Sequence, residues 1–487
     1  MRLVLLAAVA ALGCGGSRSA SHSGPPAEVA GFSATRWVPA NPTFVLTAPT
    51  VREAQRSLRD VIDSFGMIVG VESAEIATGL TRLLAVDPMN PDALAAMGID
   101  IEGGFAAFSE DLSPTIVVRL GAPEQTQAFF DQQRERGLVT QSVIVNGTEV
   151  FSAQLPAPVR ISWAIADDWL WVHFTLPFAR DTGTTWFSNS QKPQGPGWAR
   201  DWQWAQDAVK TAHPTLTGFV DAKDLLALVS SRIPQAVSCV KLLEPVSRVA
   251  IAIEGDGTRA GGQLAFDLGP AAASVSAAIL PVPEGFAAQA AGAPLSAQWN
   301  LDLLAVRAWV QPCMSAMRED LGWLDRYGVR SGRAVLLSFD PDDKSGSGAI
   351  ALDLAHKKFF ASQLDDVPMR STLERSRTYG PHAGHSLSIP FVATVDYVLT
   401  DTLALAAVGD GLLARVVGGG GGTRGPLAAI DVVPAAMSVQ AWKTIVGAID
   451  RRNAAVFVER LMRWREGHVA VTIEGTSLML SAAGTRR

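Results

Sequence analysis

Two matching stretches decide the fold. The first is Gly98-Ile-Asp-Ile-Glu-Gly-Gly-Phe-Ala-Ala-Phe108, and the second is Gly328-Val-Arg-Ser-Gly-Arg-Ala-Val-Leu-Leu-Ser-Phe339. Each stretch is followed by a second apolar strand and then by a helix that carries a Phe-Phe pair, beginning at Phe129 or Phe359. Phe359 follows Phe129 by the same 230 residues by which Gly328 follows Gly98. A solenoid repeat is far shorter than this, so the sequence predicts a tandem duplication of whole domains.

The elements predicted around these stretches define the fold class. Asn90 and Pro91 are typical of a helix start, and Asn146-Gly147 between apolar runs indicates a tight hairpin. Val249-Ala-Ile-Ala-Ile-Glu-Gly255 and Val469-Ala-Val-Thr-Ile-Glu-Gly475 extend the repeat toward the end of each half. The pattern predicts an α+β fold of two tandem duplicated domains, with mostly antiparallel sheets and packed helices.

The predicted boundaries follow from this repeat. Copy 1 covers residues 40–280, a Pro-rich junction covers 281–294, and copy 2 covers 295–487. Phe129 and Phe359 each lie on a helix that must cover the preceding strands, so both are expected to face their domain cores.

Composition limits the classes of partner. The chain has 487 residues, of which 48% are hydrophobic, and its net charge is −6. This length exceeds what one core normally supports, so two or more domains are expected. No basic patch is visible in the sequence, so no nucleic-acid partner is expected.

The N-terminus has the features of an export signal. Arg2 is followed by the apolar run from Leu3 to Leu12, which is too short to span a bilayer. The run ends in Gly13-Cys14 and resembles a bacterial lipobox, from which it departs by having Ala11 three residues before the cysteine. The resemblance implies a signal peptide over 1–13, a diacylated Cys14 and a flexible tether over 14–39. The alternative is an ordinary secretory signal beside an incidental cysteine.

The lipobox, the two glycine turns and the repeated plan together resemble a loose group of uncharacterised exported bacterial lipoproteins with duplicated α+β domains. The resemblance implies that the protein is exported and lipid-anchored in the bacterial cell envelope, at the outer membrane. It supplies no catalytic residues.

Two cysteines remain, Cys239 and Cys313. Export permits a disulfide between them, and such a bridge would close a loop of 74 residues. The alternative is two buried free thiols, because cysteine is often a small core residue. The sequence leaves both open.

Two short motifs contain residue types that can bind metal ions. His382 and His385 are only two potential ligands, in a Gly-Pro-containing segment, which favours a turn over a metal site. Asp340 to Gly346 lacks the ligand pattern of a calcium loop and is typical of a strand connection. The sequence therefore predicts no metal, no cofactor and no catalytic residue.

Tryptophan is concentrated in copy 1, where seven of the 13 residues fall between Trp163 and Trp204. Trp198, Trp202 and Trp204 lie beside a segment rich in Gly, Ser and Pro, and are the candidate ligand-binding residues. The alternative is that these rings pack into the core, which is the commoner use of aromatic side chains.

These observations favour a non-enzymatic binding or scaffolding role for a membrane-anchored envelope lipoprotein. Its partners would be the membrane, through the lipid, and a protein, glycan or lipid ligand. One alternative is a carrier of an apolar ligand, which predicts an internal cavity of several hundred Å3 or more, between or within the halves. Another is a hydrolase-type enzyme with a spatially assembled site.

Overall fold

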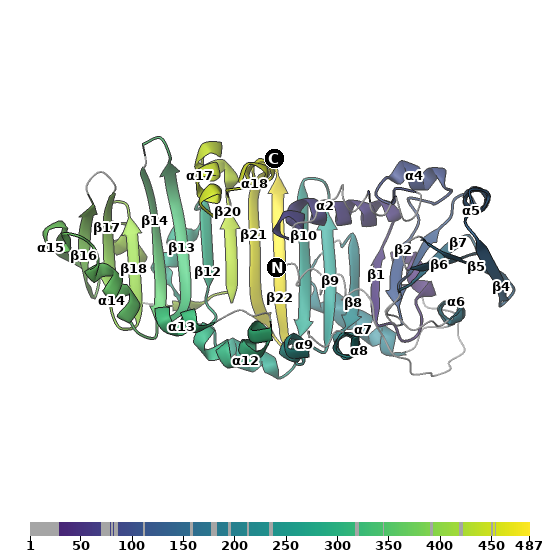
Figure 1. Ribbon diagram of the computed structural model, residues 1–487, viewed down its shortest axis with the longest axis horizontal. Helices are drawn as coiled ribbons and strands as arrows, with labels where there is room; N and C mark the ends of the chain where they lie inside the picture. Colours follow the sequence, from purple (N-terminus) through teal and green to yellow (C-terminus); the bar gives the residue numbers. More distant parts are fainter. Residues whose placement is uncertain are drawn as a thin grey trace. The chain divides into compact units, whose positions relative to one another are not determined.

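Figure 1 shows the computed structural model of the chain, in which helices and antiparallel strands confirm the predicted α+β class. It describes residues 29–69, 78, 81, 86–110, 113–155, 159–176, 183–192, 196–211, 214–232, 237–316, 321–343, 345–389, 393–417, 422–449, 451–452 and 454–487. The predicted signal peptide, Cys14 and the tether up to residue 28 lie outside these residues.

The chain divides into two compact units, with the boundary between Asp267 and Leu268. Residues 281–294, the predicted junction, lie within unit 2, where they contribute a strand and a helix.

Unit 1 combines helices and strands throughout the part of it that the structure describes. The bounds of these elements are η1 Ser33–Trp37, β1 Phe44–Ala48, α2 Val51–Val69, α4 Pro91–Ala96, β2 Phe105–Ser109, β3 Thr115–Arg119, α5 Pro123–Glu135, β4 Thr140–Val145, β5 Thr148–Gln154, β6 Arg160–Ala166, β7 Trp169–Thr175, α6 Thr185–Ser190, α7 Pro196–Ala208, β8 Leu216–Asp221, α8 Ala222–Arg232, α9 Val237–Leu243, β9 Arg248–Gly255 and β10 Arg259–Asp267.

Unit 2 is built from the same kinds of element. Their bounds are α10 Ala271–Ala277, β11 Pro281–Pro283, α11 Glu284–Ala290, β12 Leu295–Trp299, α12 Leu303–Ala316, α13 Gly322–Tyr327, β13 Val329–Asp340, β14 Ser345–Leu354, α14 Lys358–Asp365, α15 Arg370–Leu373, β15 Glu374–Tyr379, β16 His382–Ile389, β17 Ala393–Leu399, β18 Leu403–Val408, α16 Leu412–Val417, β19 Gly422–Arg424, β20 Ala428–Val432, η3 Pro434–Ala436, α17 Val439–Ile449, α18 Ala454–Leu461, β21 Trp464–Glu474 and β22 Ser477–Arg486.

The main sheets of the two units have one strand order. In unit 1 the order is β4-β5-β6-β7-β3-β2-β1-β8-β9-β10. In unit 2 it is β15-β16-β17-β18-β14-β13-β12-β20-β21-β22. The pairings described within these two sheets are antiparallel. By its place in the order, each strand of one main sheet has an equivalent in the other, whereas β11 and β19 of unit 2 pair separately with each other. The agreement concerns topology, and the origin of the two halves by duplication stays a prediction.

The two glycines at 98 and 328 have closely similar surroundings. Gly98 (φ 91°) follows α4, and Gly328 (φ 65°) caps α13. The Gly98 carbonyl accepts a hydrogen bond from Gly121 N at 2.9 Å, and the Gly328 carbonyl accepts one from Ala355 N at 2.7 Å. A Cβ would lie 2.3 Å from a backbone oxygen at Gly98 and 2.9 Å from one at Gly328. The left-handed backbone and the close approach together explain why glycine stands at both positions.

The predicted turns and caps are present where local chemistry requires them. The Asn90 side chain accepts hydrogen bonds from the first turn of α4, and Pro91 occupies its first position. Asn146 (φ 51°) and Gly147 (φ 82°) form the turn between β4 and β5, because both central residues of a tight hairpin turn need positive φ.

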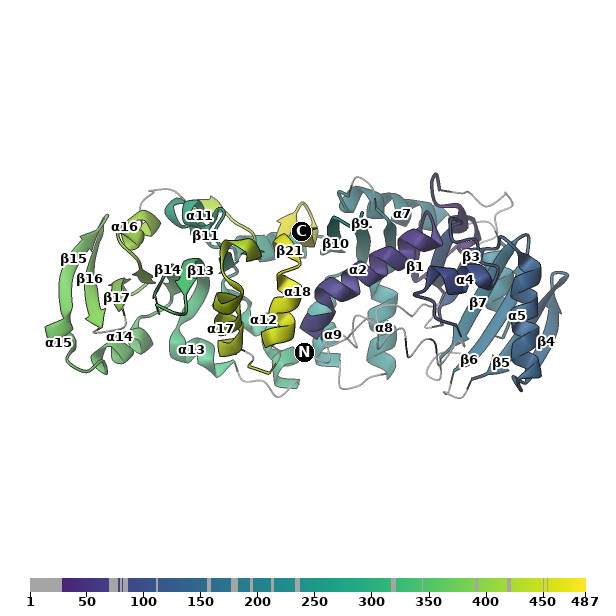
Figure 2. The same cartoon turned by 90° about the horizontal axis from the view of Figure 1, so that it is seen from above.

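Helices cover the sheet of unit 1 in separate clusters. α5 lies along the outer strands (Figure 2), and its Phe130 is buried with Trp163 of β6. α2 contributes Ala54 to a second cluster, and α8 contributes Leu225 to a third. Phe129 is only partly buried against the core that holds Phe130, so the inward-facing residue of this pair is mainly the second one.

Unit 2 has two comparable layers. α17 and α18 lie side by side (Figure 2) and cover β12, β13 and β20 through Trp442 and Val458. α11 and α16 cover β14, β17 and β18 through Phe286 and Leu413. Phe359 is partly buried and packs edge-on against Tyr327, with ring centroids 4.4 Å apart.

Candidate functional site

The outermost strand of unit 1 exposes apolar side chains. Among the residues that the structure describes, β5 is the only strand paired with β4. Val143 is 50% exposed and Ile144 is 75% exposed, while Val139, just before the strand, is 83% exposed. β4 carries no charged residue. An exposed, uncharged and β-branched edge of this kind is a template for pairing with another strand.

The equivalent edge of unit 2 has the opposite character. β15 occupies the same place in the strand order as β4. Its sequence includes Glu374, Arg375 and Arg377, and both arginines are exposed. Charged side chains on an edge strand oppose pairing with a further strand. The two units therefore share a topology and differ in whether the edge is open to a partner.

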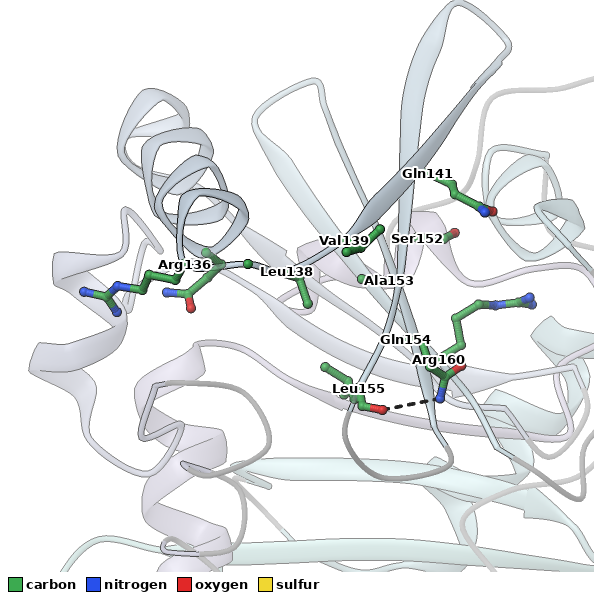
Figure 3. Close-up of a pocket in the computed structure, with 11 residues that line it drawn as sticks. Arg136, Leu138, Val139, Gln141, Ser152, Ala153, Gln154, Leu155 and Arg160 are labelled. Carbon is green, nitrogen blue, oxygen red and sulfur yellow. Dashed lines mark hydrogen bonds between the residues drawn. The ribbon is translucent and has the colours of Figure 1, made fainter.

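A groove opens beside the first residues of β4 and has a volume of about 800 Å3. It is lined by the end of α5, the start of β4, the end of β5 and the start of β6, shown in Figure 3. The lining residues are Gln133, Arg136, Gly137, Leu138, Val139, Gln141, Ser152, Ala153, Gln154, Leu155 and Arg160.

The groove combines apolar residues with positive charge. Leu138, Val139 and Leu155 supply the larger apolar side chains. Among the lining residues that the structure describes, Arg136 and Arg160 are the charged ones. Figure 3 shows the two guanidinium groups pointing away from each other, on either side of the β4–β5 hairpin. The groove at the start of β4 therefore carries two cations, one from the end of α5 and one from the start of β6, which favours anionic groups nearby.

A packed core holds this hairpin in place. The rings of Phe151 and Trp163 stack across the β5–β6 pair, 5.4 Å apart, and Phe130 stacks on Trp163 at 4.5 Å. Arg134 lies over the Phe151 ring, 5.2 Å from its centroid. The edge strand is thus presented by a rigid support, which lowers the ordering entropy that a partner would have to overcome.

The three tryptophans predicted as ligand-binding residues all lie on α7. Trp198 and Trp202 are buried and stack on each other, with centroids 5.4 Å apart and planes at 3°. Trp204 is half-buried, and the guanidinium of Arg248 lies 4.1 Å from its ring centroid. Burial leaves Trp198 and Trp202 no free face, so a ligand could stack only on Trp204. The ligand role of these rings stays a prediction.

The predicted bridging cysteines lie on two helices, Cys239 on α9 in unit 1 and Cys313 on α12 in unit 2. The bridge between them stays a prediction, as does lipidation of Cys14, which lies outside the described residues.

The histidine pair does not form a shared site. His382 and His385 lie within β16, after a turn at Gly380 and Pro381, and their odd spacing places them on opposite faces of the sheet. Within the part of the chain that the structure describes, no group of three or more His, Cys, Asp or Glu side chains is placed to hold a metal ion. Asp340 accepts hydrogen bonds from two backbone N–H groups of the turn between β13 and β14, as a strand connection would.

One cluster of ionisable side chains, on the outer strands of unit 2, was not anticipated. Glu374 accepts a hydrogen bond from Arg370 Nε at 3.1 Å and another from the Tyr397 hydroxyl, and His385 Nδ1 lies 3.6 Å from the same carboxylate oxygen. Arg370 also pairs with Asp365. These contacts tie α14, α15, β15, β16 and β17 together, which gives the carboxylate a structural role.

Sequence reasoning also missed the open edge at β4, although part of the signal was present. The Asn146-Gly147 hairpin was predicted, but its first strand was not recognised as the end of a sheet. The contrast between an uncharged Thr140–Val145 and a charged Glu374–Tyr379 is visible in the sequence once the strand order makes the two segments equivalent.

No protein-family model matches the chain, and no curated protein matches it. Among solved structures, crystal form I of TP0453 aligns with 11% sequence identity and a TM-score of 0.27, over 51% of this chain and 81% of that chain. Crystal form IV of TP0453 aligns with the same identity and TM-score, over 50% and 83%. Likeness at this level carries no argument about this chain. No helix among the described residues combines the length and hydropathy needed to cross a membrane.

Proposed function

We propose that this protein is an exported lipoprotein, anchored in the outer membrane through a lipid on Cys14, with a non-enzymatic binding or scaffolding role. The short apolar run and the following Gly13-Cys14 support the anchor. The binding site is the open β4 edge of unit 1 together with the groove beside it.

The exposed apolar edge is the observation that carries the binding role. Val143 and Ile144 lie on opposite faces of β4, because neighbouring side chains alternate along a strand. A strand added beside β4 would cover both side chains and satisfy the free backbone groups of the edge. This is the recognition mode in which a partner segment extends an existing sheet. The charges of β15 disfavour the same event at the equivalent edge of unit 2.

The anchor is tested by Cys14→Ser in the full chain. The variant should leave the membrane fraction and change its mobility, because it lacks the lipid. Retention in the membrane with unchanged mobility would overturn the anchor.

The binding role is tested by a photo-crosslinking amino acid placed at Ile144 of the membrane-bound protein. Ile430 is the matched control, since it is also an exposed isoleucine on a strand, 51% exposed, but β20 is paired on both sides. A discrete adduct is expected from position 144 and none from position 430. Equal labelling at both positions, or no adduct at 144, would contradict the role of the edge.

A carrier of an apolar ligand is the second candidate. The hypothesis calls for an internal cavity, whereas the groove is open, so its support is limited to the volume of about 800 Å3 and the apolar lining residues Leu138, Val139 and Leu155. An environment-sensitive apolar dye tests it. Leu155→Glu, at the groove wall, should then reduce dye binding, whereas Ile430→Glu should leave it unchanged. Equal binding by both variants would count against the carrier.

A further inference from the structure

The chemistry of β4 restricts the strand that can pair with it. Its six residues, Thr140–Val145, are uncharged, and the most exposed of them is the β-branched Ile144. A charged residue placed opposite Val143 or Ile144 would lose hydration without gaining a partner. β-branched and aromatic residues pack well on such a surface. The matching segment is therefore an uncharged, largely β-branched run.

The direction of this segment follows from the sheet. Throughout the sheet of unit 1, the described strand pairs are antiparallel, including β4 with β5. Antiparallel pairing is also slightly more stable per residue than parallel pairing. A segment added antiparallel to β4 ends, at its own C-terminal side, beside the first residues of β4. Leu138, Val139 and Gln141 line the groove at this place.

The charge of the groove specifies the residue that comes after the apolar run. Arg136 is exposed at the end of α5 and Arg160 begins β6, and the lining residues that the structure describes include these two cations and no Asp or Glu. Both arginines line the groove at the place where the added segment would end, and Figure 3 shows their guanidinium groups on either side of the hairpin. A carboxylate at this end has a charge complementary to the groove.

We propose that the β4 edge takes an extended partner segment in which an uncharged β-branched run is followed by a carboxylate, paired antiparallel to β4. This inference rests on the proposed binding role and names the chemistry of the partner. The carboxylate is an acidic side chain or the C-terminus of the partner, since both present the same group to the arginines. The charged edge β15 of unit 2 disfavours the same segment through Glu374, Arg375 and Arg377.

Binding is measured by fluorescence anisotropy with the full chain in detergent and short labelled peptides. The first peptide alternates Val and Thr and ends in Glu with an amidated terminus, and the second has a free C-terminus and no Glu. A third ends in Lys with an amidated terminus, and a fourth repeats the first with alternate backbone nitrogens methylated. The first or second peptide should bind, and which of them does so identifies the source of the carboxylate. The methylated peptide should not bind, because the ladder hydrogen bonds are blocked.

Two variants with matched controls test the contacts. Ile144→Lys, which copies the charge of an edge such as β15, should weaken binding about tenfold or more, while Ile430→Lys should not. Arg136→Glu should weaken binding of the carboxylate peptide roughly two- to fivefold, which is the effect of losing an exposed ion pair. It should also abolish the preference of the protein for the carboxylate peptide over the Lys peptide. Arg326→Glu is its control, because Arg326 is also an exposed arginine at a helix C-terminus. Unchanged circular dichroism spectra confirm that the variants fold.

The outcomes separate the inference from the function on which it rests. If the Glu and Lys peptides bind equally and Arg136→Glu has no effect, the proposed carboxylate contact is wrong, while the β4 edge remains the proposed binding site. If no peptide binds, or Ile144→Lys binds as tightly as the unmodified chain, the edge itself is wrong and the proposed binding site falls with it. If light scattering shows a dimer that Ile144→Lys dissociates, a second copy covers the edge, which overturns the partner segment.

Discussion

The imidazole of His385 stacks on the phenol ring of Tyr397 in unit 2, with ring centroids 5.3 Å apart and planes at 24°. The equivalent cross-strand pair in unit 1 is Phe151 and Trp163, whose rings lie 5.4 Å apart at 17°. In unit 1 the stack continues into Phe130, whereas in unit 2 it continues into a charged cluster. The outer strands are thus held by apolar burial in one unit and by polar contacts in the other.

The first prediction concerns the apolar stack of aromatic rings in unit 1. Phe130→Ala should lower the free energy of unfolding by ~3–5 kcal/mol, as expected for removing a buried aromatic ring. Phe130 is buried and stacks on Trp163, whereas Phe129 is only partly buried. Phe129→Ala is the control and should cost less. Urea denaturation measures both, and equal losses would show that the two rings contribute alike.

The second prediction concerns a buried charge in unit 2. Arg333 is 1% exposed, and its guanidinium donates to Asn300 Oδ1 at 2.8 Å, to Asp353 Oδ2 at 3.0 Å and to the Pro281 carbonyl at 2.8 Å. Arg333→Ala removes one partner of a buried network and should cost ~3–5 kcal/mol. Arg463→Ala, which breaks an exposed ion pair with Glu459, should cost at most ~1 kcal/mol. Similar denaturation midpoints for the two variants would contradict this ranking.

The third prediction is a pH dependence. Burial, followed by the nearby carboxylate of Asp396, raises the pKa of Tyr379 from 10.0 to about 12. Both states keep the phenol proton below pH 10, but the unfolded chain releases it first as the pH rises. The unfolding free energy should therefore fall between pH 10 and about 12.

Tyr379→Phe should remove part of that fall, and Tyr327→Phe serves as the control. Denaturation at several pH values gives the slope, and absorbance titration gives the late phenolate transition. A fall of the same size in Tyr379→Phe and the unmodified chain would show that Tyr379 is not its source.

The fourth prediction concerns Cys239 and Cys313. A bridge between them closes a loop of 74 residues, which in the chain-entropy model restricts the unfolded chain by roughly 4 kcal/mol. Non-reducing digestion should release one peptide pair that contains both residues, and reduction should lower the unfolding midpoint. Alkylation of both thiols in denatured, unreduced protein would exclude the bridge.

Local signals allowed much of the fold to be predicted from the sequence. The cap at Asn90, the turn at Asn146-Gly147 and the glycines at 98 and 328 each follow from the backbone geometry of one position. The α+β class followed from the order of these elements. The strand order of the sheets involves pairings between distant segments, such as β1 with β8, that local signals do not specify.

The candidate site could be predicted only in part for the same reason. Thr140–Val145 is recognisable as a strand, but its position at the end of the sheet is a property of the whole unit. The concentration of tryptophan was visible, but Trp198 and Trp202 share one face of α7 with residues of the interior. Periodicity alone cannot distinguish that face from an exposed one.

The last prediction separates packing from ligand binding at α7. Trp198 and Trp202 are buried against each other, so Trp198→Ala and Trp202→Ala should each lower the free energy of unfolding by ~3–5 kcal/mol. Trp204 is half-buried beneath Arg248, which is itself held by Asp201 at 3.0 Å and Asp267 at 3.1 Å. Because a cation over a partly exposed ring contributes ~0.5–1 kcal/mol, Trp204→Ala should cost about 1 kcal/mol.

A double-mutant cycle with Arg248→Met tests whether that loss belongs to the cation–ring contact. If packing is the role of Trp204, the two changes should be less than additive, because either one removes the same contact. If Trp204 instead serves a ligand, Trp204→Ala should leave the unfolding free energy unchanged and the cycle should show no coupling. The ring would then be held at the surface without contributing to stability, and the ligand-binding prediction for α7 would rest on Trp204 alone.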